Sequence, residues 1–365
     1  MTKPLKPIRV VVTEDSAVTR ALLTAIVEKA PGFELVAAVS DGVAAVDTVR
    51  RLRPSVVTMD LHMPRLDGVE ATRQIMRETP TPIVVVTASS EVDGRLTYEA
   101  LAAGALSVVA RPVGPSDPRF APRRDRLLAE LRLMAGVSVV RRVERSESCA
   151  PAQSRASAPP LEPWRPVRPA RVVAIAASTG GPTALHRLLR DLPRDFDVPI
   201  VVVQHMSEGF IGGLARWLSD VAPGPVRIAR DGDALAHGVV FLAPDGSHLR
   251  VAADGTVHLD AGPPIGGHRP AATALFDSVA KAYGAGAIGI VLTGMGRDGA
   301  EGLVRLRATG AMTLAQDAAS SAVFGMPGAA IEVGAVERVL SLEDLGPTIA
   351  ALATAGPDRR RGDPR

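Results

Sequence analysis

The chain has 365 residues, of which 46% are hydrophobic and only 3% aromatic, and 42 basic against 39 acidic side chains give a net charge of +3. This length favours two domains, and a core of Val, Ala, Leu and Ile is typical of parallel sheets covered by helices. The balanced charge does not indicate a nucleic-acid partner, and the single cysteine, Cys149, excludes an intramolecular disulfide. No stretch reaches the roughly 20 apolar residues of a membrane span, so we expect a cytoplasmic protein without direct membrane insertion.

Residues 7–125 alternate short β-branched runs with helical patterns. The runs predicted as strands are 8–13, 34–39, 55–60, 82–87 and 106–110. The helical patterns begin near Ser16, Asp41, Asp67, Glu91 and Ser116. Repeated βα units with short connections predict an α/β fold with a doubly wound parallel sheet, here of the flavodoxin-like type.

The composition changes after this first domain. Residues 126–169 contain the end of a helix and then a stretch rich in Arg, Pro, Ser and Ala without an apolar period, which predicts a flexible linker. A second and larger α/β pattern covers residues 170–355, and residues 356–365 are predicted to form a disordered tail. The strands predicted in this second domain are 171–177, 199–205, 239–244 and 287–294.

Acidic and hydroxyl side chains follow the strands of the first domain. Glu14 and Asp15 close the first strand, Asp60 the third and Thr87 the fourth. In a parallel sheet these ends lie on one edge, where ligands bind. Clustered carboxylates repel one another unless a cation compensates, and a cluster of oxygen ligands prefers Mg²⁺. With its charge neutralised, Asp60 could attack a phosphoryl donor, while the Thr87 hydroxyl bonds the transferred oxygens.

This arrangement, with MDLHMPRLDG around Asp60, resembles the receiver domain of two-component response regulators. The resemblance implies that Asp60 is the phosphorylated residue, that Glu14, Asp15 and Asp60 hold Mg²⁺, and that Thr87 is the switch hydroxyl. One position departs from the family. Receivers normally carry a lysine before the proline that follows the fifth strand, whereas this chain has Arg111 in VVARP. A guanidinium is larger, planar and fork-shaped, so the replacement is not conservative.

Three strand ends of the second domain carry the residues of a nucleophilic hydrolase. Ser178 follows one strand within ASTGG, His205 follows the next within QHM, and Asp298 lies in TGMGRDG. A serine hydroxyl needs an imidazole to accept its proton, and the imidazole needs a carboxylate that fixes its tautomer. The three side chains meet this need if the fold brings the strand ends together.

Backbone groups near Ser178 are suited to bind an oxyanion. Thr179, Gly180 and Gly181 form a tight turn that opens a helix, and a second glycine-rich loop around Met295 offers further N–H groups. The turn could instead cradle a nucleotide phosphate, but it lacks the spaced glycines of a dinucleotide fingerprint and the Gly-Lys-Ser/Thr of a P-loop. It also lacks the Gly-x-Ser-x-Gly pattern of α/β-hydrolases.

Together, ASTGG, QHM, HRP, TGMGRDG and QDAASSAVFGMP resemble the catalytic domain of the chemotaxis protein-glutamate methylesterase family. The resemblance implies that Ser178 attacks the γ-methyl ester of a glutamate on a methyl-accepting chemotaxis receptor, that His205 is the general base, and that Asp298 orients His205. It also implies deamidation of receptor glutamines, and no cofactor for the ester hydrolysis. In this family the unphosphorylated receiver restricts access to the active site, and the chemotaxis histidine kinase is the phosphodonor.

Two departures from this family are expected to leave the triad untouched. Ala176 replaces a glycine, and Ala271, Ala272 and Thr273 replace a Ser-x-Asp pattern after HRP. Two other functions agree with parts of the sequence. One is the same hydrolase acting on a receptor-like protein outside chemotaxis, and the other is a phosphorylation-regulated adaptor without catalysis. A DNA-binding regulator is disfavoured because the second domain shows neither a helix-turn-helix pattern nor a concentrated basic face.

Overall fold

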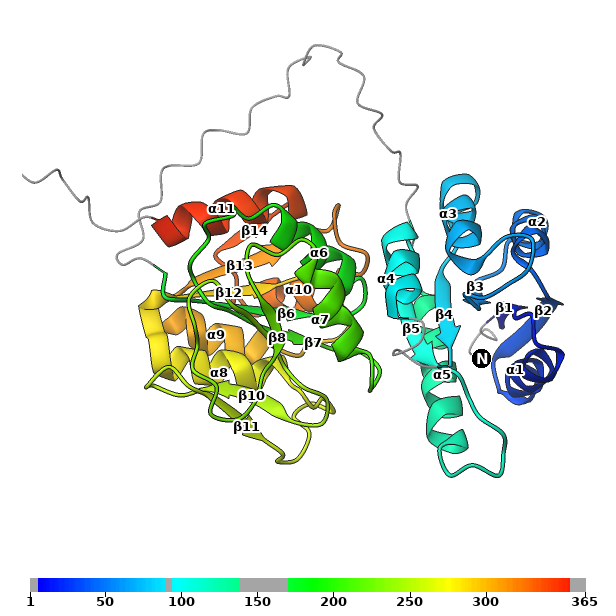
Figure 1. Ribbon diagram of the computed structural model, residues 1–365, viewed down its shortest axis with the longest axis horizontal. Helices are drawn as coiled ribbons and strands as arrows, with labels where there is room; N and C mark the ends of the chain where they lie inside the picture. The colour runs from blue at the N-terminus through cyan, green and yellow to red at the C-terminus, as the bar shows by residue number, and fades with distance from the viewer. Residues whose placement is uncertain (1–5, 89–93, 138, 140–169, 355–365) are drawn as a thin grey trace, which may run out of the picture.

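The computed structural model describes residues 6–88, 94–137, 139 and 170–354, which form two α/β domains (Figure 1). Most of the predicted linker, Cys149, the helix start predicted near Glu91 and the predicted tail lie outside the described residues. Within the described part of the chain, no helix has both the length and the apolar character needed to cross a membrane.

The first domain contains a five-stranded sheet of order β2-β1-β3-β4-β5, in which every neighbouring pair is parallel. Its strands are β1 (Ile8–Thr13), β2 (Phe33–Val39), β3 (Val56–Met59), β4 (Ile83–Thr87) and β5 (Ser107–Ala110). Its helices are α1 (Ala17–Lys29), α2 (Gly42–Leu52), α3 (Gly68–Glu78), α4 (Gly94–Ala103) and α5 (Phe120–Met134). Buried side chains pack α1 and α5 on one face and α2, α3 and α4 on the other. The predicted doubly wound sheet is confirmed.

Helix starts in this domain follow from short polar side chains. Ser16, Asp41 and Asp67 are N-caps, and each accepts a hydrogen bond from the backbone N–H three residues later. Such caps satisfy N–H groups that have no partner inside the helix. The last helix, α5, begins at Phe120 rather than near Ser116.

The second domain contains a seven-stranded parallel sheet of order β14-β13-β12-β6-β7-β9-β8. Its strands are β6 (Val172–Ala177), β7 (Ile200–Gln204), β8 (Val226–Ile228), β9 (Val240–Leu242), β12 (Ala287–Val291), β13 (Met312–Gln316) and β14 (Arg338–Leu340). An antiparallel hairpin joins β10 (His248–Val251) to β11 (Val257–Asp260). The helices are α6 (Gly181–Arg190), α7 (Ile211–Ser219), α8 (Ala272–Tyr283), α9 (Ala300–Ala308), α10 (Gly325–Glu332) and α11 (Leu342–Thr354), with a 3₁₀ turn η1 (Gly284–Gly286).

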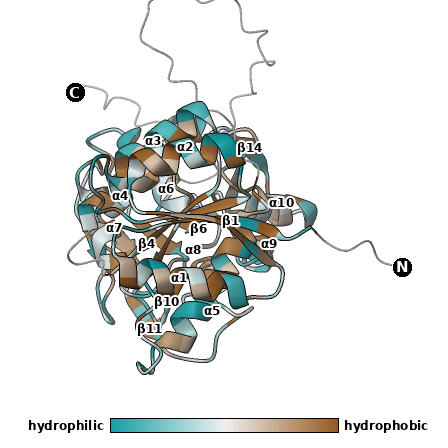
Figure 2. Ribbon diagram, turned by 90° about the vertical axis from the view of Figure 1, so that its right-hand side faces the viewer, coloured by the Kyte–Doolittle hydropathy of each residue, from teal (hydrophilic) through white to brown (hydrophobic). Residues whose placement is uncertain are grey.

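Helices cover both faces of this larger sheet. Side chains of α6, α7 and α11 pack on one face, and those of α8, α9 and α10 pack on the other together with the hairpin. Figure 2 shows apolar strands in the middle of the molecule and polar residues on the outer sides of the helices. Strands buried on both faces explain why continuous apolar runs, not alternating ones, marked β6, β7, β9 and β12 in the sequence.

The two domains meet along α4, which faces α6 and α7 (Figure 1). Tyr98 on α4 is fully buried, stacks on Trp217 with ring centroids 5.3 Å apart, and donates a hydrogen bond to the carbonyl of Phe210. Gly213 makes this close approach possible, because a Cβ there would lie 2.7 Å from the Tyr98 ring. The hydroxyl of Ser207 also donates to the carbonyl of Val108 at 3.1 Å. The first domain therefore lies beside the ends of the second domain's central strands.

Candidate active site

The strand order of the second sheet brings the three predicted strand ends together. β12, β6 and β7 are consecutive neighbours in the sheet. Ser178 follows β6, His205 follows β7, and Asp298 lies in the loop between β12 and α9. In a parallel sheet these loops share the carboxyl edge, which is where α/β proteins bind ligands. The three residues predicted as a triad therefore share one edge of the sheet.

Asp298 contacts the imidazole of His205 directly. Its Oδ2 lies 2.9 Å from His205 Nε2, and the two side chains are only 4% and 10% exposed. Burial by itself raises the pKa of Asp298, but the contact with His205 and the hydrogen bonds from Ala272 and Thr273 outweigh burial and lower the pKa to about 2. The group is therefore a carboxylate at neutral pH. It can hold a proton on His205 Nε2 and stabilise the imidazolium.

The N-terminus of α8 holds the Asp298 carboxylate in place. The N–H of Ala272 donates to Oδ2 at 2.6 Å, and the N–H and hydroxyl of Thr273 donate to Oδ1 at 3.1 and 2.8 Å. The N-cap of α8 is Ala271, which has no side chain to satisfy these groups, so Asp298 caps the helix from another loop. The expectation that the Ala271-Ala272-Thr273 departure leaves the triad untouched is wrong, because Thr273 bonds Asp298.

Gln204 ties the backbones of Ser178 and His205 together. Its Nε2 donates to the carbonyls of both residues at 2.8 Å, and its side chain is buried. In addition, the N–H of Ser178 donates to Thr293, and the N–H of His205 donates to Ala177. Sequence reasoning missed this role of Gln204. Its only signal was an amide side chain at the end of an otherwise apolar strand.

The predicted oxyanion residues lie around Ser178. Gly180 is the N-cap of α6 with φ +74°, and Gly181 is the first residue of that helix. A Cβ on Gly181 would lie 2.1 Å from Gln204 Oε1, so the turn needs glycine there. Thr179 and Met295 line a cavity of about 640 Å³ that also contains Ser178 and His205. The N–H of Gly181 donates to the carbonyl of Ser178 at 2.8 Å, which tightens the turn, and the positive N-terminal end of α6 suits a developing negative charge.

Both domains form the walls of this cavity. The residues that the first domain contributes are Leu101, Leu106, Ser107, Val108, Arg126, Glu130 and Leu133. A second cavity of about 690 Å³ lies alongside and is lined by Gly180, Met295 and apolar residues of both domains. Ser178 therefore lines a cleft whose opposite wall is the first domain.

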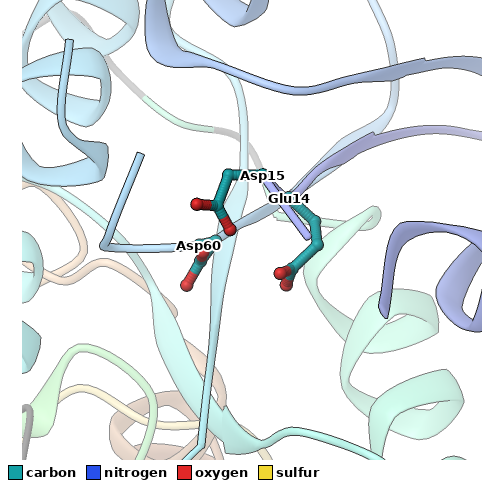
Figure 3. A group of neighbouring side chains, drawn as sticks. All are labelled: Glu14, Asp15 and Asp60. Carbon is teal, nitrogen blue, oxygen red and sulfur yellow. The ribbon is translucent and has the colours of Figure 1, made fainter. Parts of the chain in front are cut away.

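The acidic residues predicted to bind Mg²⁺ are gathered at the ends of β1 and β3 (Figure 3). Glu14, Asp15 and Asp60 each offer a carboxylate oxygen, and these atoms lie within 4.8 Å of one another. Burial, with a further contribution from the Asp60 charge, raises the pKa of Glu14 to about 7. Burial also raises the pKa of Asp60, although the N–H of Leu61 and the charge of Arg111 oppose it. A cluster of crowded oxygen ligands, two of them buried, fits a small divalent cation.

Arg111 and Thr87 complete this pocket. Arg111 Nη1 lies 3.4 Å from Glu14 Oε1, and its guanidinium is 29% exposed. Thr87 ends β4 and is buried. The pocket tolerates no side chain at Gly68, where a Cβ would lie 1.9 Å from the carbonyl of Asp60. The positive charge of Arg111 thus acts on the carboxylates of both Glu14 and Asp60 and opposes the rise in their pKa values.

Known proteins share both parts of this architecture. Residues 10–119 match the family model of the response regulator receiver domain, and residues 173–349 match that of the CheB methylesterase. A protein-glutamate methylesterase/protein-glutamine glutaminase of Anaeromyxobacter dehalogenans (strain 2CP-C) is 48% identical over 94% of this chain and 98% of its own length. The chain belongs to the CheB methylesterase family. A relative with the same description from Myxococcus xanthus (strain DK1622) is 48% identical over 93% of this chain and 95% of its own.

Membership of the CheB methylesterase family confirms the predicted family, its hydrolase class and its receiver-plus-esterase architecture. Among solved structures, the Thermotoga maritima CheB methylesterase catalytic domain is 37% identical, covers 50% of this chain and 98% of that chain, and gives a TM-score of 0.49.

Proposed function

We propose that this protein hydrolyses γ-methyl esters of glutamates on methyl-accepting chemotaxis receptors, in the cytoplasm, and deamidates particular receptor glutamines to glutamate. The observation that carries this proposal is the buried pair of His205 and Asp298 in the cleft that Ser178 lines. The substrate class comes from the relatives, whose descriptions name protein glutamate methyl esters and protein glutamine. A cleft open on the edge of the sheet suits a side chain presented on the surface of another protein.

Both reactions use the same sequence of steps. Ser178 Oγ attacks the carbonyl carbon of the ester while His205 takes its proton, and Asp298 stabilises the imidazolium. N–H groups of the turn at Thr179 and Gly180, with the loop at Met295, bind the tetrahedral oxyanion, while Gly181 holds the turn through its own bond to Ser178. His205 then protonates the leaving oxygen and methanol departs. Water attacks the acyl-serine and releases the glutamate carboxylate; with glutamine, ammonia leaves in place of methanol.

Methanol release from methylated receptor fragments tests this function. We expect the wild-type chain to release methanol and to leave free glutamate side chains, and to release ammonia from fragments that carry the corresponding glutamines. The measurement is quantified methanol and ammonia, with mass spectrometry of the fragments before and after reaction. Fragments unchanged in mass, with and without phosphorylation of the protein, would contradict the proposal.

We further propose that phosphorylation of Asp60 by the chemotaxis histidine kinase controls access to the cleft. Glu14, Asp15 and Asp60 would hold Mg²⁺, which neutralises the carboxylates so that an anionic phosphodonor can approach. Asp60 would then attack the phosphorus while the bond to the phosphohistidine nitrogen of the kinase breaks and the imidazole leaves, and the Thr87 hydroxyl and Arg111 guanidinium would bind the transferred oxygens. The support for control is that residues at the start of β5, Ser107 and Val108, and residues on α5 line the cleft of Ser178, while the other end of β5 pairs with Thr87 of β4. A shift of these elements opens the cleft.

A small phosphodonor should raise the ester hydrolysis rate of the wild-type chain by about 5- to 150-fold, the range of typical coupling energies. In Asp60→Asn the rate should not respond, because no phosphoryl acceptor remains. Asp47→Asn is a matched control on the exposed side of α2 and should respond like wild type. Equal rates for all three proteins with and without the donor would refute the regulation. Arg111→Lys, measured in the same way, tests whether the guanidinium limits activation.

A further inference from the structure

A second histidine lies flat against the catalytic one. The rings of His205 and His268 have centroids 4.2 Å apart and planes inclined by only 8°. His268 lines the same cavity as Ser178 and is partly exposed to it. The triad chemistry assigns it no role, and its sequence context, GGHRP, showed no metal-binding spacing. A parallel stack in the active site therefore needs its own explanation.

The loop that carries His268 is built to hold it. Ile265 and His268 exchange two backbone hydrogen bonds of 3.0 Å across a two-residue turn. The turn residues, Gly266 and Gly267, have φ of +58° and +86°, which is the conformation of a tight type I′ turn and requires glycine-like residues. Arg269 closes the base of the loop by donating to the carbonyls of Ala261 and Gly262 at 3.1 Å. The position of the His268 backbone is thus fixed on both sides.

The surroundings of His268 favour its neutral form. Burial first, and then the positive charge of a protonated His205, lower the pKa of His268 from its ordinary value of 6.5. Arg126, which reaches in from α5, lowers it further, while Asp298 raises it. The other titratable groups that line the cavity are Glu130, Glu208, Asp245 and Arg269. Because the pKa is lowered, the ring is neutral at neutral pH and gains its charge only as the pH falls.

A neutral aromatic face beside His205 has two consequences for ester hydrolysis. The catalytic ring is anchored at one edge, through Nε2 and Asp298, and the stack prevents it from tilting away from that contact. When His205 takes the proton of Ser178 it becomes a cation, and a cation is stabilised over the face of a neutral ring. A protonated His268 would do the reverse, since two stacked cations repel each other.

We propose that His268 is a positioning residue for the hydrolysis: its neutral ring holds His205 against Asp298 and stabilises the imidazolium that forms there. The proposal rests on the proposed esterase function. It predicts that His268 acts on kcat and on the pH dependence of the reaction, and not on substrate binding, because His268 acts through His205.

The test uses the full chain, activated by the phosphodonor, and compares His268→Ala with His268→Phe. His268→Ala should lower kcat by roughly 5- to 30-fold with KM nearly unchanged. His268→Phe keeps a flat ring that cannot be protonated. It should recover most of the lost kcat, and its rate should fall less steeply toward acid pH than that of wild type because one titrating group is gone. His258→Ala is the matched control, since His258 is exposed and pairs with Asp231 on the far loop.

Two readouts separate this inference from the proposed function. Methanol release from receptor fragments reports the natural reaction, and release of p-nitrophenol from a p-nitrophenyl ester, in its Ser178-dependent part, reports the triad alone. If the wild type releases methanol and His268→Ala matches its kcat and pH profile, the role of His268 is refuted while the function stands. A His268→Phe variant as slow as His268→Ala, with unchanged pH dependence, refutes the role as well. Equal thermal unfolding midpoints show that the variants are folded.

Discussion

Ser178→Ala should abolish methanol release from methylated receptor fragments, with kcat lower by roughly 10⁴- to 10⁶-fold, the usual cost of removing a nucleophile that acts together with its base. The change deletes one oxygen atom. The backbone N–H and C=O of residue 178, which bond Thr293 and Gln204, stay in place. The variant should therefore fold, bind the fragments with nearly unchanged affinity, and form no acyl-enzyme.

Ser219→Ala provides the control for this experiment. Ser219 ends α7, and its hydroxyl donates to the carbonyl of Ala215 one turn earlier in the same helix. This variant should retain the wild-type rate. A Ser178→Ala protein that still releases methanol at more than one hundredth of the wild-type rate would exclude Ser178 as the nucleophile and would point to a different catalytic group.

The sequence predicted the fold well where burial dominates. Runs such as IVVVT and VVAIAA are buried on both faces of a sheet, so they read as unbroken apolar segments that could be placed from composition alone. The strands that were missed are short or carry polar residues. β8 and β14 have three residues each and include an arginine, and β10 begins with His248. Their strand character comes from pairing with a neighbouring strand, β9 for β8, β13 for β14 and β11 for β10, and not from an apolar pattern of their own.

The sequence predicted those residues of the candidate site that follow the end of a strand. Ser178 and His205 each follow an apolar strand directly, and Asp298 follows one through a glycine-rich loop, so a shared sheet edge was enough to group them. Thr273 and His268 could not be placed in this way. Thr273 reaches Asp298 only because α8 begins under the loop after β12, and His268 reaches His205 only through a hairpin turn. Such contacts depend on tertiary packing that no local pattern encodes.

The sequence did not predict the interface between the two domains either. Tyr98 is one of two tyrosines in the chain, and its position on a helix predicts only a core or surface residue. In the structure it is buried between domains, with Trp217 stacked on it. The interface places β5 and α5 of the receiver over the cleft, so few elements separate Asp60, the proposed phosphorylation site, from Ser178, the proposed nucleophile.

Asp298→Asn is the substitution that separates the chemistry of the carboxylate from its structural role. Asn keeps the size of the side chain, and an oxygen in the Oδ1 position can still accept from the N–H and hydroxyl of Thr273, while the N–H of Ala272 loses its acceptor. Its amide would then face His205 Nε2 as a donor, so Nε2 would have to accept and the proton would move to Nδ1. That tautomer leaves no lone pair to take the proton of Ser178. We expect kcat to fall by roughly 10⁴-fold, the cost known for a triad aspartate with geometry intact.

Asp298→Ala should lose a similar factor in rate and also stability, because the N–H groups that open α8 would lose their acceptor, at a cost of about 1 kcal/mol. Rates and urea unfolding curves of both variants distinguish the two roles, with Asp277→Asn as the control on the exposed side of α8, where its partner is Arg305.

The pKa of Asp298, about 2, means that this carboxylate stays ionised above about pH 4. Lowering the pH to that point therefore does not reproduce the effect of either substitution. As the pH falls through that pKa, the proton that binds Asp298 also removes the stability that its depressed pKa provides. A fully active Asp298→Asn protein would show that His205 works without an ionised partner, and the buried carboxylate would then be only the cap of α8.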